Sequence, residues 1–348
     1  MKTSDFYFDL PDERIAQYPA ARGESRLLVL ERSSGRRFHQ VVRDLPGLIE
    51  SGALMVFNDT RVRKARIFGT DGRGRESEFL LIEEAAGPST WEVITKKAAR
   101  RVGERFRFAG SGSGGMEAEL LYPEGRCLLR FDRPVDDAWL DAHGHVPLPP
   151  YIRRADDPAD GDRYQTVYAR RHGSAAAPTA GLHFTEALLS ELAGRGVETA
   201  FITLHVGLGT FLPVRSADVE DHKMHRESFC IESGTAARIE AAKREGRKVI
   251  AVGTTTLRAL ESAWRDGGFQ TGSQSTDIFI YGDYRFRTAD GLFTNFHTPA
   301  STLLMLVCAF AGAESGGEAG RKLILETYRE AIQQRYNFFS YGDAMLIL

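Results

Sequence analysis

The sequence predicts an α/β protein with a three-layer α/β/α main domain and an inserted small antiparallel β-barrel domain. Three observations support this. Short strands and glycine-rich turns follow one another closely from about 64 to 134, strands and helices alternate after Pro150, and 348 residues suffice for two domains. We therefore expect residues 1–63 and 148–348 to form the discontinuous α/β domain and residues 64–147 to form the barrel.

The first strand expected in the main domain is Ala53–Phe57. The barrel strands are then expected at Ala65–Gly69, Glu78–Glu83, Trp91–Thr95, Arg105–Phe108, Glu117–Leu121 and Cys127–Phe131. The turn GSGSGG at Gly110–Gly115 formally matches a dinucleotide-binding G-x-G-x-x-G, but no helix follows it. We predict a hairpin loop there.

The main domain continues with alternating elements after residue 150. Helices are expected at Glu186–Leu192, Thr235–Glu245, Leu257–Trp264 and Arg321–Tyr336, and strands at Val197–Val206, Lys248–Val252, Thr276–Tyr281 and Leu292–Phe296. The apolar run Leu303–Ala311 is too short to span a membrane, so it predicts a buried helix capped by Ser301 or Thr302.

Composition is that of an ordinary globular protein, with 42% hydrophobic and 26% charged residues. A net charge of −2 means that any affinity for nucleic acid must come from local basic patches. The three cysteines are far apart in sequence, which indicates reduced thiols, and Asp5 and Asp9 interrupt any apolar core of a signal peptide. We expect a cytoplasmic monomer that binds no membrane.

The string AAAPTAGLHFT at Ala175–Thr185 predicts a binding loop. Its small residues carry too little apolar volume for a core, Thr179 adds a hydroxyl, and Gly181 permits close backbone approach to a ligand. His183 then places a titratable ring beside that ligand.

The turn GTTT joins the strand Lys248–Val252 to the next helix. Unpaired amides at the helix start and the hydroxyls of Thr254, Thr255 and Thr256 would suit an anion. An ordinary threonine cap is the alternative explanation.

Further histidines and glycines occur near predicted strand ends, where open α/β sheets bind ligands. The string HVGLGTF contains His205, Gly207 and Gly209, and TNFHTPAST contains Asn295 and His297. A structural turn is the alternative for the first string.

Two other strings add polar and aromatic groups. DHKMH contains His222, but the spacing is not that of a zinc site, so we expect no metal and favour hydrogen bonding or proton transfer. FFSYGDAM contains Tyr341 and Asp343, which would suit a cationic ligand or simply pack in the core.

Basic residues cluster at Arg61–Arg66 and at Lys96–Arg107, beside or within the predicted barrel. Such runs are usually solvated surface, yet two of them near one inserted domain also suit a nucleic-acid backbone.

Together the strings resemble the S-adenosylmethionine:tRNA ribosyltransferase-isomerases of queuosine biosynthesis. The resemblance runs from Phe6 to the C-terminus and is weakest through the barrel. It is carried by AAAPTAGLHFT, HVGLGTFLPV, EDHKMHRE, VIAVGTTTLRALES, TNFHTPASTLLMLVCAFAG, RYNFFSYGDAML, SRLLVLER, VFNDTRV, GHVPLPPYI and RYQTVYA.

The resemblance implies an enzyme that transfers and isomerises the ribosyl group of S-adenosylmethionine onto 7-aminomethyl-7-deazaguanine at the tRNA wobble position. Epoxyqueuosine-tRNA, adenine and methionine would be the products, with no cofactor beyond this co-substrate. Candidate catalytic residues are His183, His205, His297 and Asp343. Candidate substrate-binding residues are Arg61, Thr179, Gly181, Gly207, Gly209, His222, Thr254, Thr255, Thr256, Arg258, Asn295 and Tyr341.

Two other functions remain open on the sequence. An S-adenosylmethionine-dependent RNA methyltransferase would share donor and RNA, but the chain has no glycine-rich motif after a first strand. A non-catalytic RNA-binding protein would fit the basic runs but would leave the histidine-bearing loops unused.

We predict that the barrel helps to hold tRNA. Neutralising Arg100 and Arg101 should weaken tRNA binding and flatten its log–log salt dependence by roughly one to two units, because fewer counterions are released. Filter binding at several salt concentrations measures this. Normal binding at moderate salt would make the run a solvated face.

Overall fold

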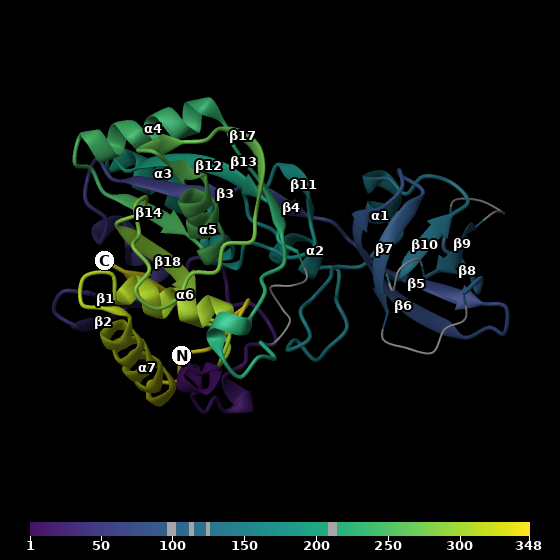
Figure 1. Ribbon diagram of the computed structural model, residues 1–348, viewed down its shortest axis with the longest axis horizontal. Helices are drawn as coiled ribbons and strands as arrows, with labels where there is room; N and C mark the ends of the chain where they lie inside the picture. The colour runs from purple at the N-terminus through teal and green to yellow at the C-terminus, as the bar shows by residue number, and fades with distance from the viewer. Residues whose placement is uncertain (96–101, 111–114, 123–125, 208–213) are drawn as a thin grey trace.

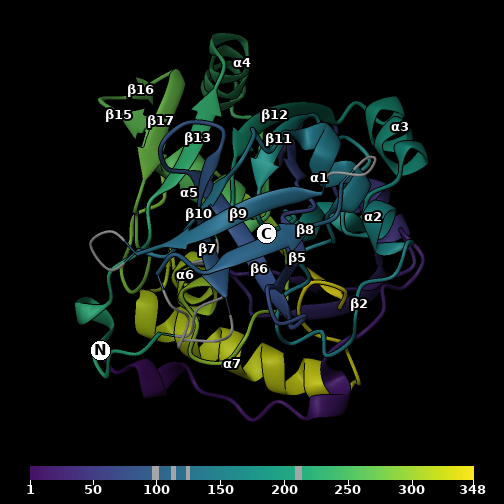
Figure 2. The same cartoon turned by 90° about the vertical axis from the view of Figure 1, so that its right-hand side faces the viewer.

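The computed structural model describes residues 1–348 except 96–101, 111–114, 123–125 and 208–213. A larger body contains a nine-stranded mixed sheet, and a closed six-stranded barrel lies to one side of it (Figure 1). In Figure 2 the barrel faces the viewer, with α4 (Ser233–Arg244) and α7 (Gly317–Gln333) at opposite ends of the body behind it.

The large sheet has the strand order β17-β13-β12-β3-β14-β18-β19-β1-β2. Strands β12, β3, β14 and β18 run parallel, whereas β19 is antiparallel to β18 and parallel to β1. The strands span β1 Arg26–Leu30, β2 Arg37–Val41, β3 Leu54–Asn58, β12 Glu198–Leu204, β13 Glu227–Ile231, β14 Val249–Val252, β17 Gly272–Thr276, β18 Gly291–Asn295 and β19 Ala344–Ile347.

Both faces of this sheet are buried, which explains why its central strands are continuously apolar. In β3, Leu54 and Val56 join a core with the helices α4 to α7, while Met55 and Phe57 join a second core with α3 on the other face. The predicted three-layer α/β/α body is confirmed. The remaining helices of these layers are α3 Glu186–Gly194, α5 Thr254–Ala263 and α6 Thr302–Ala311.

The barrel closes in the order β10-β7-β6-β5-β8-β9. Alternate residues of its strands point inward, as in β9, whose Met116, Ala118 and Leu120 are buried. All six predicted strands are confirmed within two residues: β5 Arg66–Asp71, β6 Glu76–Glu84, β7 Thr90–Thr95, β8 Arg105–Phe108, β9 Met116–Leu121 and β10 Leu128–Phe131. Residues 111–114 of the predicted hairpin loop lie outside the described residues.

The barrel is inserted in sequence between two short strands of the body. Strand β4 (Thr60–Val62) precedes it, and β11 (Arg171–Ser174) follows it and pairs with β4 in parallel. Helices α1 (Asp137–His143) and α2 (Asp160–Arg163) lie on the return path. The domain limits 64–147 stay a prediction.

The strand predicted at Thr276–Tyr281 is wrong, because β17 ends at Thr276. Apolar residues after Thr276, among them the buried Ile280, pack on the core without forming a strand. Their apolar sequence is what suggested a strand. Side chains replace strand partners there: Ile278 N donates to Thr276 Oγ1, and Arg258 Nε donates to Ile278 O.

The strands β15 (Trp264–Arg265) and β16 (Gly268–Phe269) form a separate small sheet, and short 3-10 helices lie at Thr3–Phe6, Asp12–Arg14, Val42–Gly47, Thr179–His183 and Val219–Asp221. Helix α6 is buried and capped by Ser301, whose Oγ accepts from Leu304 N, as predicted. Within the described residues, no helix is long and apolar enough to cross a membrane.

Gly320 sets the contact between α6 and α7. A Cβ atom there would lie 2.3 Å from Cys308 O and from Gly312 N, so Gly320→Ala should push the two helices apart. We expect it to lower the free energy of unfolding by about 2 kcal/mol or more, measured in urea.

The matched control is Gly234→Ala in α4, where an added Cβ meets nothing within 4 Å. It should raise the free energy of unfolding by about 0.5 kcal/mol through helix propensity alone. Equal effects of the two substitutions would contradict the packing argument.

Candidate active site

A cavity of about 230 Å³ opens at the carboxyl ends of β12, β14 and β18. This is the edge at which open α/β sheets bind ligands. Its walls come from the loop after β11, the start of α5, the segment that joins β18 to α6, and the turn before β19. The lining residues are Tyr151, 176–180, Val206, 253–255, 294–303, Phe339 and Ser340.

The loop predicted to bind a ligand forms one wall. Ser174 Oγ donates to Ala176 O and accepts from Val206 N, which fixes the start of the loop. Gly181 has to be glycine, because a Cβ would lie 2.1 Å from the hydroxyl of Tyr168. Ala176 and Val206 line the cavity, whereas Gly181 supports the loop from behind.

Two helices begin at the cavity. Gly253 caps α5 with a φ of 96°, and Thr254 and Thr255 line the wall, whereas Thr256 Oγ1 donates to Val252 O in the strand. The capped start of α6 lies in the same wall. Unpaired amides and the helix dipole make both starts favourable for a carboxylate or phosphate.

The cavity is otherwise electrically neutral. Among the described residues that line it, none is Asp, Glu, Lys or Arg, and hydroxyl groups predominate. Two of them, on Tyr151 and Ser340, are hydrogen-bonded to each other at 2.6 Å. Ala300 and Phe339 adopt left-handed φ angles of 53° and 72°, a strain that concentrates at functional sites.

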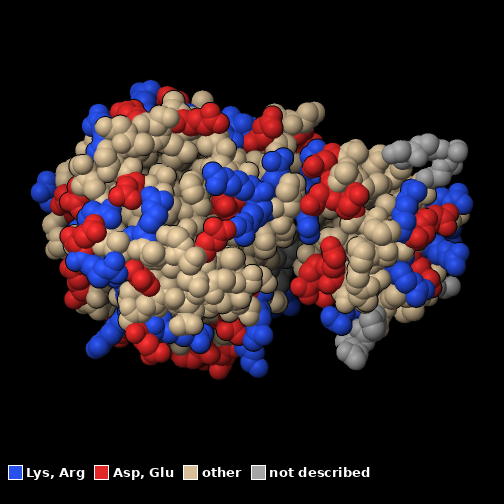
Figure 3. All heavy atoms as spheres, turned by 90° about the horizontal axis from the view of Figure 1, so that it is seen from above, with Lys and Arg blue, Asp and Glu red and all other residues tan. Residues whose placement is uncertain are grey.

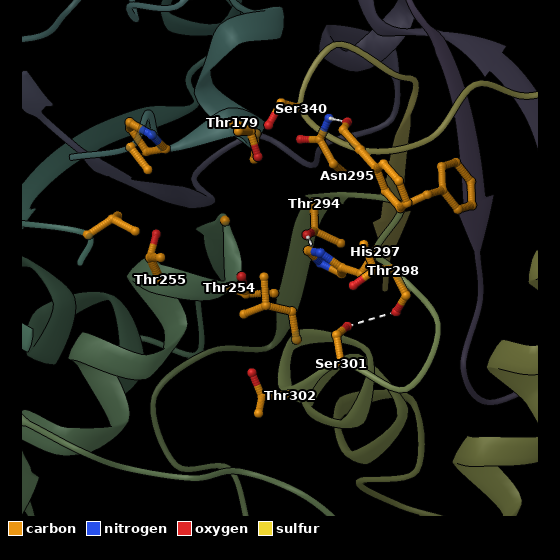
Figure 4. A pocket seen from close by; sticks show the side chains of 18 of the residues that line it. Thr179, Thr254, Thr255, Thr294, Asn295, His297, Thr298, Ser301, Thr302 and Ser340 are labelled. Carbon is orange, nitrogen blue, oxygen red and sulfur yellow. Dashed lines mark hydrogen bonds between the residues drawn. The ribbon is translucent and has the colours of Figure 1, made fainter. Parts of the chain in front are cut away.

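His297 is the one histidine among the described lining residues (Figure 4). Its Nε2 is hydrogen-bonded to Thr294 Oγ1 at 3.0 Å, and its backbone N–H donates to the hydroxyl of Tyr328. Burial lowers the pKa of His297 to about 3, so its ring is neutral. No described residue pairs with Nδ1, which leaves this nitrogen for a ligand or a proton.

His183 lies behind the cavity wall rather than in it. The residue is buried, its Nε2 is 3.2 Å from Asn295 Nδ2, and Asn295 lines the cavity. Burial lowers the pKa of His183 to about 4. Of the predicted catalytic residues, His297 lines the cavity, whereas His183 contacts the lining residue Asn295.

The other two predicted histidines lie elsewhere. His205 Nδ1 is hydrogen-bonded to Thr60 Oγ1 at 2.8 Å, and its ring lines a separate hollow over β13 and β17. The ring of His222 packs edge-on against Phe279. Gly209 lies outside the described residues.

Arg258 is buried in α5 and does not reach the cavity. It forms an ion pair with Glu227, whose Oε1 accepts from Gly207 N at 3.2 Å. Arg258 thus acts on the Gly207 loop through Glu227.

Tyr341 and Asp343 also lie outside the cavity. The Tyr341 hydroxyl donates to Asp160 Oδ1 at 2.7 Å, while Asp343 accepts from the backbone N–H groups of Arg26 and Asn337. Burial raises the pKa of Asp343. These contacts hold the C-terminal turn in place.

The first predicted basic run lies where the two bodies meet. Arg63 and Arg66 form ion pairs with Asp137 and Asp156, whereas Arg61 is exposed. Figure 3 shows Lys and Arg side chains gathered on the larger body beside the hollow that separates it from the barrel.

Of the second basic run, Arg105 and Arg107 lie in the barrel strand β8. Arg107 pairs with Glu117 across β8 and β9. Residues 96–101, with Arg100 and Arg101, lie outside the described residues.

Several lining residues were not predicted as site residues. Among them are Tyr151, Thr294, Thr298, Ser301, Thr302, Phe339 and Ser340. The density of hydroxyls in TNFHTPAST was the available signal. No group of three or more His, Cys, Asp or Glu side chains in the described parts of the chain could hold a metal ion.

The fold and the cavity define an α/β protein that binds a small polar ligand at the carboxyl edge of its sheet. A family model described as queuosine biosynthesis protein matches residues 3–347. An S-adenosylmethionine:tRNA ribosyltransferase-isomerase of Treponema denticola is 51% identical over 356 residues and covers 100% of both chains.

Two further proteins indicate the same family. The equally named protein of Acetivibrio thermocellus is 49% identical, again over 100% of both chains. The crystal structure of an S-adenosylmethionine tRNA ribosyltransferase from Thermotoga maritima is 32% identical, with a TM-score of 0.55 over 99% of this chain and 100% of that one. The chain belongs to the S-adenosylmethionine:tRNA ribosyltransferase-isomerase family of queuosine biosynthesis.

We predict that acid destabilises the fold through His183 and His297. Their folded pKa values, about 4 and about 3, lie below the ordinary 6.5, so between these values the unfolded chain binds more protons. The contribution of the two neutral histidines to the free energy of unfolding is complete above pH 6.5 and is lost progressively as the pH is lowered. Urea unfolding at pH 7.5 and pH 5 should differ by roughly 1–2 kcal/mol for each histidine.

His297→Asn should reduce this pH dependence, whereas replacing the exposed His225 should leave it as in the wild type. Equal pH dependence in all three proteins would show that these histidines do not control acid stability.

Proposed function

We propose that this chain transfers and isomerises the ribosyl group of S-adenosylmethionine onto 7-aminomethyl-7-deazaguanine at the tRNA wobble position, releasing adenine and methionine. The observation that carries the proposal is the full-length family match combined with a neutral, hydroxyl-lined cavity in the family's shared motifs. We also propose that the enzyme acts as a monomer and in the cytoplasm.

The cavity suits the charges of the donor. A sulfonium cation meets no described Lys or Arg in the lining, and the starts of α5 and α6 offer amides to the methionine carboxylate. The rings of Tyr151 and Phe339, 4.6 Å apart, add an aromatic surface for a flat base.

His297 is the residue we assign to proton transfer. The sulfonium acidifies the neighbouring C5′ protons, so the reaction needs a base with a free lone pair close to that carbon. The His297 imidazole is kept neutral by burial and has its Nδ1 unpaired among the described residues. Tyr151, the other titratable group in the described lining, has its pKa raised by burial and stays protonated.

The decisive assay incubates the protein with S-adenosylmethionine and tRNA that carries the aminomethyl base. Adenine and methionine in equal amounts support ribosyl transfer. S-adenosylhomocysteine would instead indicate the methyltransferase, and binding without product would indicate the non-catalytic RNA-binding protein.

We predict that His297→Asn retains the wild-type melting temperature within a few degrees but loses about 100-fold or more in kcat, because a positioned acid–base group contributes about that much. Release of adenine is the measurement. His143→Asn, in helix α1 and outside the motifs shared with the family, is the control with wild-type turnover. Near-normal turnover of His297→Asn would remove this residue from the chemistry.

A further inference from the structure

The side-chain amide of Asn295 has a fixed orientation at the end of β18. Its Nδ2 donates to Phe339 O at 3.0 Å. A carbonyl oxygen can only accept, so the atom that faces it has to be the amide nitrogen. Phe339 is held in the left-handed region at φ 72°, and this conformation belongs to the turn that presents its carbonyl to Asn295.

The second hydrogen of Asn295 Nδ2 is donated to His183. Its Nε2 lies 3.2 Å from Asn295 Nδ2, and since Nδ2 is a donor, Nε2 has to be the acceptor. The imidazole is therefore neutral with its proton on Nδ1, in agreement with a pKa that burial lowers to about 4.

The remaining amide atom, Oδ1, has no hydrogen-bond partner although Asn295 is only 2% exposed. Figure 4 shows this oxygen on the side of Ser340 and Thr179, both of which line the cavity. A buried acceptor without a partner is unfavourable, and this one is held in place by two contacts on its nitrogen.

We propose that Asn295 Oδ1 recognises an N–H or O–H donor group of the S-adenosylmethionine co-substrate, and that His183 is the positioning residue that keeps this oxygen facing the cavity. The inference rests on the proposed function. Three groups of that molecule have the required chemistry: the 6-amino group of adenine, the α-ammonium group of methionine and the ribose hydroxyls.

The first experiment measures binding by calorimetry without tRNA. Wild type and Asn295→Ala are titrated with S-adenosylmethionine and with analogues in which the 6-amino, the α-amino or a ribose hydroxyl group is absent. Asn295→Ala should weaken binding of S-adenosylmethionine roughly tenfold or more. The analogue that lacks the recognised group should bind the wild type about as weakly as S-adenosylmethionine binds Asn295→Ala. The substitution should then weaken the binding of that analogue only a little further.

Two outcomes would overturn the proposal: unchanged affinity of Asn295→Ala for S-adenosylmethionine, or an equal loss for all the analogues. Failure of the wild type to bind S-adenosylmethionine both without tRNA and with tRNA that lacks the aminomethyl base would instead refute the proposed function.

The second experiment separates positioning from proton transfer at His183. Gln can accept from Asn295 Nδ2 as the imidazole does, whereas Leu cannot. The KM for S-adenosylmethionine should rise roughly tenfold in His183→Leu and clearly less in His183→Gln, with kcat changing less than KM in both. Thermal unfolding checks that both variants fold.

A His183→Gln protein with normal KM and abolished kcat would place His183 in the chemistry and refute its positioning role. Equal KM increases in the Gln and Leu variants would refute it as well.

Discussion

Burial of both faces of the nine-stranded sheet is the constraint on which the rest of the body depends. Because apolar side chains fill both surfaces of β3, β14 and β18, polar groups can gather only at the strand ends. The chain places Asn58, Thr294 and Asn295 there, all buried and all hydrogen-bonded. The cavity forms at this polar edge, between the helix starts that follow the strands.

The neutrality of the cavity follows from how its polar groups are paired. Arg258 and Glu227 form an ion pair with each other and do not line the cavity. Glu227 also accepts a hydrogen bond from Gly207 N. The polar groups that the described lining residues present to a ligand are hydroxyls, amides and one imidazole. Such a surface suits a co-substrate that carries both a cation and a carboxylate, since neither group meets a fixed charge of its own sign among the described lining residues.

The sequence predicted local patterns well and long-range contacts poorly. The barrel strands show the period-two burial pattern of an amphipathic strand, as in β6 and β9, so their positions followed from pattern alone. Their order did not, because only four of the six strand pairs join consecutive strands, whereas β5 pairs with β8 and β7 with β10. Strand β19 was missed because Ala344–Ile347 has no alternation, being buried on both faces between β18 and β1. At the site, the motif around His297 was informative, but only the folded chain shows that Asp343 caps backbone amides and that His205 faces another hollow.

The strand order also determines when the body can be completed during synthesis. The barrel strands lie within one continuous stretch of sequence, so the barrel can close while the rest of the chain is still emerging. Strand β1 can pair at once with β2, but its other neighbour and both neighbours of β3 come more than 100 residues later. That other neighbour of β1 is β19, the last strand along the sequence, which lies between β18 and β1. Until β19 is synthesised, nothing joins the part of the sheet from β17 to β18 to the pair β1–β2. The unpaired edges of β18 and β1 are then open to wrong pairing, and a chaperone that binds them would prevent it.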